Sequence, residues 1–133
     1  MTVIQRPSAV GLLLCRSTII EQGTKHVTLV NSFQRLALPR FPFAPSFSAY
    51  TVLTDGLGDM RLSLIVSRCD TMEEIYTRTL RMAFRNPLPH VPIYWQIRSC
   101  SFPLPGRYQF VLTANGDIIT QNTVEITQGD SRG

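Results

Sequence analysis

The chain of 133 residues is poor in the side chains on which enzymes and metal sites most often depend. His26 and His90 are its only histidines. Its three cysteines, Cys15, Cys69 and Cys100, form no CxxC pair, and their odd number argues against a disulfide framework and a structural zinc site. We therefore expect reduced, mostly buried thiols, no bound metal and no cofactor.

Long hydrophobic runs are also absent. The longest uncharged apolar run, residues 9–15, is far shorter than the roughly 20 residues needed to cross a bilayer. A single arginine, Arg6, precedes that run, and no small-residue cleavage site follows it, so the amino terminus does not have the pattern of a secretory signal. We expect no membrane partner and a cytoplasmic location.

Lysine is almost missing. Lys25 is the only one, and the other twelve of the 13 cations are arginine. With nine carboxylates the formal net charge is +4 and the pI is about 9.3, a balance that can indicate nucleic-acid binding. The arginines are scattered singly along the sequence, however, and no basic block could follow a phosphate backbone. We therefore do not expect nucleic acid as a partner.

The residues that are present suffice for one hydrophobic core. Hydrophobic residues make up 44% of the chain and charged residues 17%. A chain of this length can bury roughly two thirds of its unfolded surface in a single domain. Residues 128–133 contain no apolar side chain. We predict one domain over residues 1–127 and a disordered tail over residues 128–133.

Short apolar and polar alternations, separated by turn signals, recur along the chain and are typical of strands. Residues 60–67 are a clear example, because apolar side chains occupy every second position. Asn115 and Gly116 tolerate positive φ between two such runs, so residues 108–126 predict a hairpin. We expect strands near residues 10–16, 27–33, 47–54, 60–67, 93–99, 108–113 and 118–126.

Residues 71–84 fit two structures. Thr71 and Glu74 match a helix capping box, and Glu74 lies four residues before Arg78, on what would be one helix face. The same segment also alternates, with apolar side chains at positions of one parity and β-branched residues among them. We favour a strand here and keep a single helix as the alternative.

Strands with frequent turns and no firm helix predict an all-β fold. We expect a single immunoglobulin-like antiparallel β-sandwich of about eight strands with Greek-key connections. Three prolines within residues 36–45 remove backbone donors, so this segment is predicted as a connector between the sheets. Residues 87–92 contain three more prolines and predict a loop.

Tyr108, Gly106 and Trp95 are assigned structural roles. In immunoglobulin-like sandwiches a tyrosine at the entry to a late strand can fold its hydroxyl back onto upstream backbone, and Tyr108 stands in that place. Gly106 permits the close bend before it. Trp95 alternates with Ile93 and Ile97, which predicts an inward ring in the core.

Several segments, taken in order, resemble a known family. They are Leu-Cys at 14–15, Val-Asn-Ser-Phe at 30–33, the proline-containing 36–45, Ser-Phe-Pro-Leu-Pro-Gly-Arg-Tyr-Gln-Phe at 101–110, and Asn-Gly at 115–116. Together they look like a family of small uncharacterised bacterial proteins, described as a domain of unknown function, and the similarity runs from about residue 12 to residue 126. After Val66 the family tends to have an Asp-Pro-x-Gly turn, whereas this chain has Arg-Cys-Asp-Thr at 68–71. The resemblance implies a cytoplasmic immunoglobulin-like sandwich and no particular activity.

Carboxylates lie at several predicted strand ends, as they do in calcium-binding sandwiches. They are Asp55, Asp59, Asp70, Glu73, Glu74 and Asp117. Counting strands up and down places the turn at residues 55–59 at the opposite end of the sandwich from residues 115–117. We therefore expect these carboxylates to serve their turns and not a metal site.

No set of residues has the pattern of a reacting site, which favours a binding function. We predict a non-catalytic protein-interaction or accessory module of a bacterial cytoplasmic system. Its loops or an exposed edge strand would contact another protein or a second copy of the chain. The predicted contact residues are Phe41, Phe43 and His90, with Arg40 and Arg85 as charged anchors. The opposing interpretation is that the two phenylalanine rings close the open end of the core.

The alternative is a small-ligand-binding or enzymatic sandwich. Its pocket would lie between the sheets, near Trp95 and Cys100. No glycine turn flanks the cysteines in the manner of a nucleophile elbow, so the sequence indicates no catalytic residue.

Overall fold

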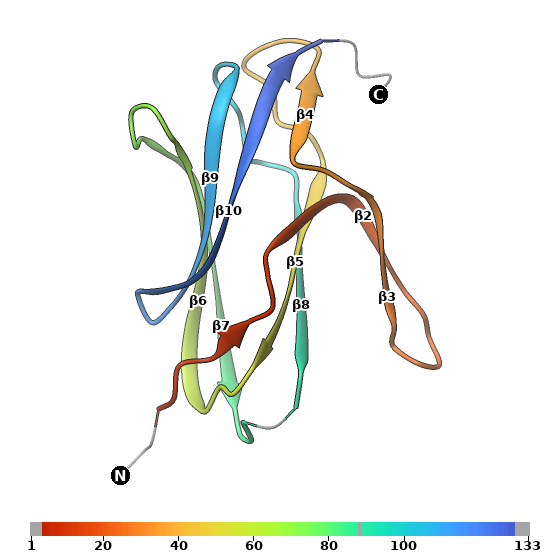
Figure 1. The fold of residues 1–133 in the computed structure, drawn as a ribbon, viewed down its shortest axis with the longest axis vertical. Helices are drawn as coiled ribbons and strands as arrows, with labels where there is room; N and C mark the ends of the chain where they lie inside the picture. The colour runs from red at the N-terminus through yellow and green to blue at the C-terminus, as the bar shows by residue number, and fades with distance from the viewer. Residues whose placement is uncertain (1–3, 88, 130–133) are drawn as a thin grey trace.

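The described part of the chain forms ten strands in an all-β fold (Figure 1). The computed structural model describes residues 4–87 and 89–129, and this part contains no helix. The strands are β1 (Ser8–Ala9), β2 (Leu13–Ile20), β3 (Val27–Ser32), β4 (Arg35–Leu38), β5 (Phe47–Thr54), β6 (Gly58–Arg68), β7 (Glu74–Phe84), β8 (Val91–Ile97), β9 (Gly106–Ala114) and β10 (Asp117–Gln128). The preference for a strand over a helix at residues 71–84 is confirmed by β7.

The strands are arranged in two sheets. In one sheet β5 pairs with β1, β2 and β8, and β2 in turn pairs with β3. The other sheet has the order β4-β10-β9-β6-β7. All pairs are antiparallel except β4 with β10, which is parallel. The prediction of about eight strands, all antiparallel, is therefore corrected to ten strands with one parallel pair.

The first three residues of the predicted connector, residues 36–38, belong to strand β4. Leu36 and Leu38 are both buried, because the alternation that starts at Arg35 directs every second side chain into the core. The strand lies parallel to the end of β10, with Leu36 opposite Ile126. It ends before Pro39, which has no N–H to donate.

Strand β10 extends into the segment predicted to be a disordered tail, residues 128–133. Gln128 is still part of the strand, opposite Leu38. The Gly129 N–H then donates to the Leu38 carbonyl at 3.0 Å. The ordered region therefore includes residues 128 and 129, and residues 130–133 of the predicted tail lie outside the described residues.

Local hydrogen bonds explain why residues 71–84 do not begin a helix. The Thr71 Oγ1 accepts from the Glu73 N–H at 3.3 Å, which makes a short turn in place of a helix cap. The Met72 N–H donates to the Arg68 carbonyl at 2.9 Å, and the Arg68 N–H donates to the Glu73 carbonyl at 2.8 Å. These bonds close the β6–β7 hairpin, after which β7 pairs with β6 along almost its whole length.

A cluster of aromatic rings joins the two sheets. The ring centroid of Phe47, in β5, lies 6.0 Å from that of Phe110, in β9, and 6.1 and 6.3 Å from those of Phe33 and Phe102. Phe102 also packs edge-on against Tyr108, with centroids 4.9 Å apart. Such edge-to-face pairs add about 0.5–1.5 kcal/mol each beyond the area they bury. Phe47 therefore anchors one sheet to the other.

Tyr108 is held by its hydroxyl as well as by its ring. The hydroxyl donates to the Leu104 carbonyl at 2.6 Å, and this contact to upstream backbone is the one that defines a tyrosine corner. Gly106 lies between the two residues with φ +148°, a conformation that L side chains rarely adopt. Trp95 is buried, on the core-facing side of β8.

The β2–β3 hairpin projects from the sandwich, as Figure 1 shows. Leu13, Leu14 and Cys15, at the beginning of β2, pair with β5. Residues 17–20 pair with β3 instead, and among the described strands β3 has no neighbour other than β2. We call this two-stranded projection the β2–β3 arm.

Candidate functional site

The edges of the two sheets are the first candidate surfaces. An edge strand exposes unpaired N–H and C=O groups, to which another chain can add a strand. Apart from the two-residue β1, the edges of one sheet are β3 and β8, and the edges of the other are β4 and β7. Natural proteins protect such edges with charged side chains, proline, short strand length or covering side chains. An edge strand that lacks these features is a candidate binding surface.

Three of the four edges are protected. Strand β7 carries Arg78 and Arg81. Strand β8 contains Pro92, and the Arg78 Nη1 donates to the Gln96 carbonyl at 2.7 Å, so a side chain from the other sheet covers this edge. Strand β4 has four residues and begins with Arg35. Each of these edges is a poor template for a further strand.

Strand β3 lacks these protections. Residues 27–30, which we call the β3 edge, contain no charge and no proline, and the positive φ of Asn31 bends the chain after them. The arm that carries this edge also presents apolar side chains to solvent. Ile19 is 57% exposed, and Val27, Leu29 and Val30 are half-buried. A two-stranded hairpin that buries so little is marginal on its own, which suits a segment that a partner stabilises.

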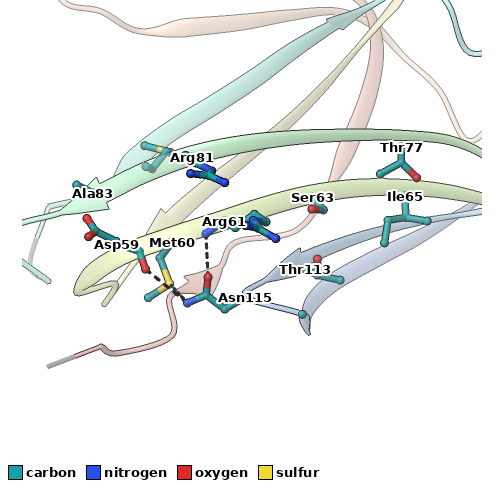
Figure 2. Close-up of a pocket in the computed structure, with 12 residues that line it drawn as sticks. Asp59, Met60, Arg61, Ser63, Ile65, Thr77, Arg81, Ala83, Thr113 and Asn115 are labelled. Atoms are coloured by element: carbon teal, nitrogen blue, oxygen red, sulfur yellow. Dashed lines mark hydrogen bonds between the residues drawn. The ribbon is translucent and has the colours of Figure 1, made fainter. Parts of the chain in front are cut away.

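A hollow on the outer face of the second sheet is the other candidate surface. It has a volume of about 950 Å³ and lies over β6, β7 and the end of β9 (Figure 2). We call it the arginine hollow, after two of the side chains that line it. Its polar lining includes Asp59, Arg61, Ser63, Arg81, Thr113 and Asn115.

The two arginines of the hollow stand directly opposite each other. Arg61 of β6 and Arg81 of β7 are register partners, and both are exposed. The outward direction of Arg61 follows from sequence parity, because Leu62 beside it is buried, and its register partner Arg81 lies on the same face of the sheet. Their pairing does not follow from sequence, because it depends on the register that the turn after β6 sets. Cross-strand partners have Cβ atoms about 4.5–5.5 Å apart, so the two guanidinium groups can reach the same ligand.

Asn115 fixes the floor of the hollow. Its Oδ1 accepts from the Arg61 N–H at 2.9 Å, and its own N–H donates to the Arg61 carbonyl at 2.9 Å. Its Nδ2 also lies 3.5 Å from the Asp59 carbonyl oxygen. The β9–β10 turn and the start of β6 therefore lie side by side. This corrects the prediction that residues 55–59 and 115–117 lie at opposite ends of the sandwich.

The five predicted contact residues do not form one surface. Phe43 exchanges backbone hydrogen bonds with Phe102 at 2.8 and 3.2 Å, and Phe41 and Phe43 are partly buried against the core. The Arg40 guanidinium lies 5.0 Å from the centroid of the Phe43 ring. The two rings therefore lie against the core beside Phe102.

Arg85 and His90 lie elsewhere, in the loop between β7 and β8. That loop meets the β5–β6 turn, where the Asp55 N–H donates to the Pro87 carbonyl at 2.8 Å. Strand β8 runs from this loop toward the segment that contains Phe102, and its seven residues span roughly 20 Å. A single partner loop could not contact both groups.

Trp95 and Cys100, the residues of the alternative pocket, are both core residues. Cys100 is fully buried, and burial raises the pKa of its thiol to about 12. The Trp95 Nε1 is buried without a hydrogen-bond partner among the described residues. The hollows described for the chain are lined by other residues.

Neither metal-binding clusters nor membrane-crossing helices occur in the described part of the chain. Residues 4–87 and 89–129 contain no group of three or more His, Cys, Asp or Glu side chains placed to hold a metal ion. The same residues contain no helix of the length and apolarity that crossing a bilayer requires.

A family model matches almost the whole chain. The model is described as "Family of unknown function (DUF6941)", and it covers residues 11–127. The chain belongs to the DUF6941 family. The predicted membership in a family of unknown function is thereby confirmed.

Comparison with individual proteins adds one structural likeness. The DUF6941 protein is similar to a solved structure described as "Pseudomonas fluorescens alkylpurine DNA glycosylase AlkC bound to DNA containing an abasic site analog", with 13% identity and a TM-score of 0.44. The match covers 71% of this chain and 28% of that chain. No curated protein matches the DUF6941 protein.

Proposed function

We propose that this protein is a non-catalytic protein-interaction module of a bacterial cytoplasmic system, and that its partner adds a strand to the β3 edge. In this binding mode main-chain hydrogen bonds supply affinity, and alternate side chains supply specificity. We also propose that the sandwich is immunoglobulin-like with Greek-key connections, for which the bond between the Tyr108 hydroxyl and the Leu104 carbonyl is the support.

The contrast among the edge strands is the observation that carries this proposal. The β3 edge is uncharged and proline-free and lies on a projecting arm, whereas arginine, proline or short length protects β4, β7 and β8. Because the β3 edge has no charge, the partner strand should also be uncharged. Because Val27 and Leu29 are half-buried in the hairpin, the partner should bring aliphatic side chains that cover them.

The protonation of the buried thiols supports a function in which Cys15 and Cys100 do not act as nucleophiles. A cysteine attacks as the thiolate. Burial raises the pKa of Cys100 to about 12, and burial is also the main cause of the raised pKa of Cys15. Both thiols therefore stay protonated near neutral pH and act as packing groups.

A charge placed on the β3 edge should abolish binding. Thr28 is exposed, so Thr28→Lys should change the free energy of unfolding by no more than about 0.5 kcal/mol. The added ammonium would lose its solvation if a partner strand docked beside it. We expect Thr28→Lys to eliminate self-association in sedimentation velocity and to eliminate capture of the partner by a photo-crosslinker placed at Ser32.

Thr123→Lys is the matched control, because Thr123 is an exposed threonine in β10, away from the arm. It should leave association and capture unchanged. The proposal fails if the wild-type chain stays monomeric and no stoichiometric partner is recovered from native lysate in mild salt. It also fails if both lysine variants reduce binding equally.

A second candidate function is the binding of a small ligand near Trp95 and Cys100. One observation favours it: the Trp95 Nε1 is buried and has no partner among the described residues, and buried donors are generally satisfied. A metabolite and metal screen by thermal shift distinguishes the two functions. A saturable stabilisation that Trp95→Phe removes would support the ligand-binding function.

A further inference from the structure

Arg61 and Arg81 form a like-charge pair on the outer face of the second sheet. They are register partners on β6 and β7, and like charges directly opposite each other destabilise a sheet. The ion pairs in the described part of the chain involve neither of them. These pairs are Arg6 with Asp117, Arg35 with Glu125, and Arg68 with Asp70. An anion held between the two guanidinium groups would turn this repulsion into attraction.

Hydroxyl donors lie next to the arginines on the same outer face. Ser63 and Thr79 occupy the next outward positions on β6 and β7, and their oxygens are 3.0 Å apart. Thr113 of β9 stands opposite Ser63 on the other side. Figure 2 shows Arg61, Ser63, Arg81 and Thr113 on neighbouring strands around the same hollow. Guanidinium forks and hydroxyl groups are the donors that recognise phosphate oxygens.

Asp59 reduces the net positive charge of the hollow. It lies on the same outer face of β6 as Arg61, two residues before it, and it lines the hollow. The two arginines and this carboxylate sum to a single positive charge. Long-range electrostatic attraction would therefore contribute little to the binding of a long polyanion. The affinity for an anion would depend on direct hydrogen bonds from the guanidinium groups of Arg61 and Arg81.

We propose that the arginine hollow binds a phosphoryl oxyanion, bridged by Arg61 and Arg81 and hydrogen-bonded by the hydroxyls of Ser63 and Thr113. Inorganic phosphate and a phosphorylated serine side chain both present this group. The site lies on the opposite sheet from the β3 edge. It can therefore be occupied whether or not a partner strand binds there, and its test is independent of the proposed function.

The test is a titration followed by amide chemical shifts in NMR spectra. Inorganic phosphate and, separately, a short peptide containing phosphoserine are added to the full chain at constant ionic strength, with chloride as the balancing ion. We expect saturable shifts at Arg61, Arg81 and Thr113. Arg61→Gln and Arg81→Gln should each weaken binding by about tenfold or more, because each removes charge-assisted hydrogen bonds.

Arg107→Gln is the matched control. Arg107 is also exposed on this sheet, but it stands opposite Glu125 and outside the hollow. It changes net charge by the same amount and should leave the affinity within about twofold, a difference smaller than one charge-assisted bond makes. Arg81→Lys keeps the charge and loses the fork, and it should weaken binding by an intermediate factor. Because Arg81 lies on an edge strand, its variants should keep the fold even if Arg61→Gln does not.

Saturation by either ligand, with the loss confined to the two hollow arginines, supports the proposal, and the tighter ligand identifies the source of the phosphoryl group. The absence of saturable shifts with both ligands would overturn it. An equal loss in Arg107→Gln would also overturn it, because that result indicates general attraction by net charge.

Discussion

Phe47→Ala should lower the free energy of unfolding by about 3–5 kcal/mol, the usual cost of truncating a buried phenylalanine. Phe47 is 1% exposed and packs against Phe33, Phe102 and Phe110, which come from three different segments. The substitution removes ring contacts between the two sheets and leaves a cavity that rigid strands cannot close. Domains of this size have about 5–15 kcal/mol of stability in total, so much of it should disappear. Urea unfolding followed by Trp95 fluorescence measures the loss.

Tyr94→Ala is the control for this substitution. Tyr94 lies in β8, the strand paired with β5, but its side chain is 47% exposed and faces solvent. Its truncation should cost no more than about 1 kcal/mol, because little buried area is lost. If Phe47→Ala cost as little as Tyr94→Ala, the aromatic cluster would not be what joins the sheets.

Alkaline pH should destabilise the protein through its buried thiols. Burial raises the pKa of Cys100 to about 12 from an ordinary value of 9.0. Above pH 9 the unfolded chain therefore releases a proton that the folded chain retains. Stability is unaffected below that pH and declines from about pH 9 until about pH 12. By linkage, the loss from Cys100 near pH 11 is about 2–3 kcal/mol. The raised pKa values of Cys15 and Tyr108, caused mainly by burial, add to it.

Denaturant unfolding at a series of pH values in a reducing buffer measures this decline. Cys100→Ala should remove most of the extra loss between pH 9 and 11, whatever it costs at neutral pH. Cys69 is exposed, so Cys69→Ala should leave the decline as it is. An equally steep decline in Cys100→Ala would show that a different group is responsible.

The parts of the fold that sequence predicts are those whose pattern is local. The β9–β10 hairpin follows from alternation on both sides of Asn115 and Gly116, and β6 follows from its strict period of two. The all-β class follows from the same signal repeated. Strand β4 does not follow from the sequence because its apolar run, residues 36–38, is only three residues long and is followed by three prolines within seven residues. Its parallel partner, β10, also lies at the far end of the chain.

The candidate sites depend on features that are not local. Arg61 and Arg81 meet because the β6–β7 pairing shifts register between Val66 and Ser67, and such a one-residue shift cannot be read from alternation. The two turns beside Asn115 meet because β6 and β9 are antiparallel neighbours, which a count of strands up and down does not show. The β3 edge stands out only when all four edges are compared. The loop residues Phe41 and Phe43 were singled out by type, but their burial depends on contact with Phe102.

Hydrogen exchange at the amides of residues 27–30 tests most directly whether partners bind at the β3 edge. With increasing protein concentration, or on addition of a captured partner, those of these amides that do not already bond to β2 should exchange at least roughly tenfold more slowly, as amides newly protected by a strand ladder do. The amides of β8 should not change, and Thr28→Lys should abolish the protection. Slower exchange at β7, at β8 or around Phe43, with residues 27–30 unaffected, would contradict the account.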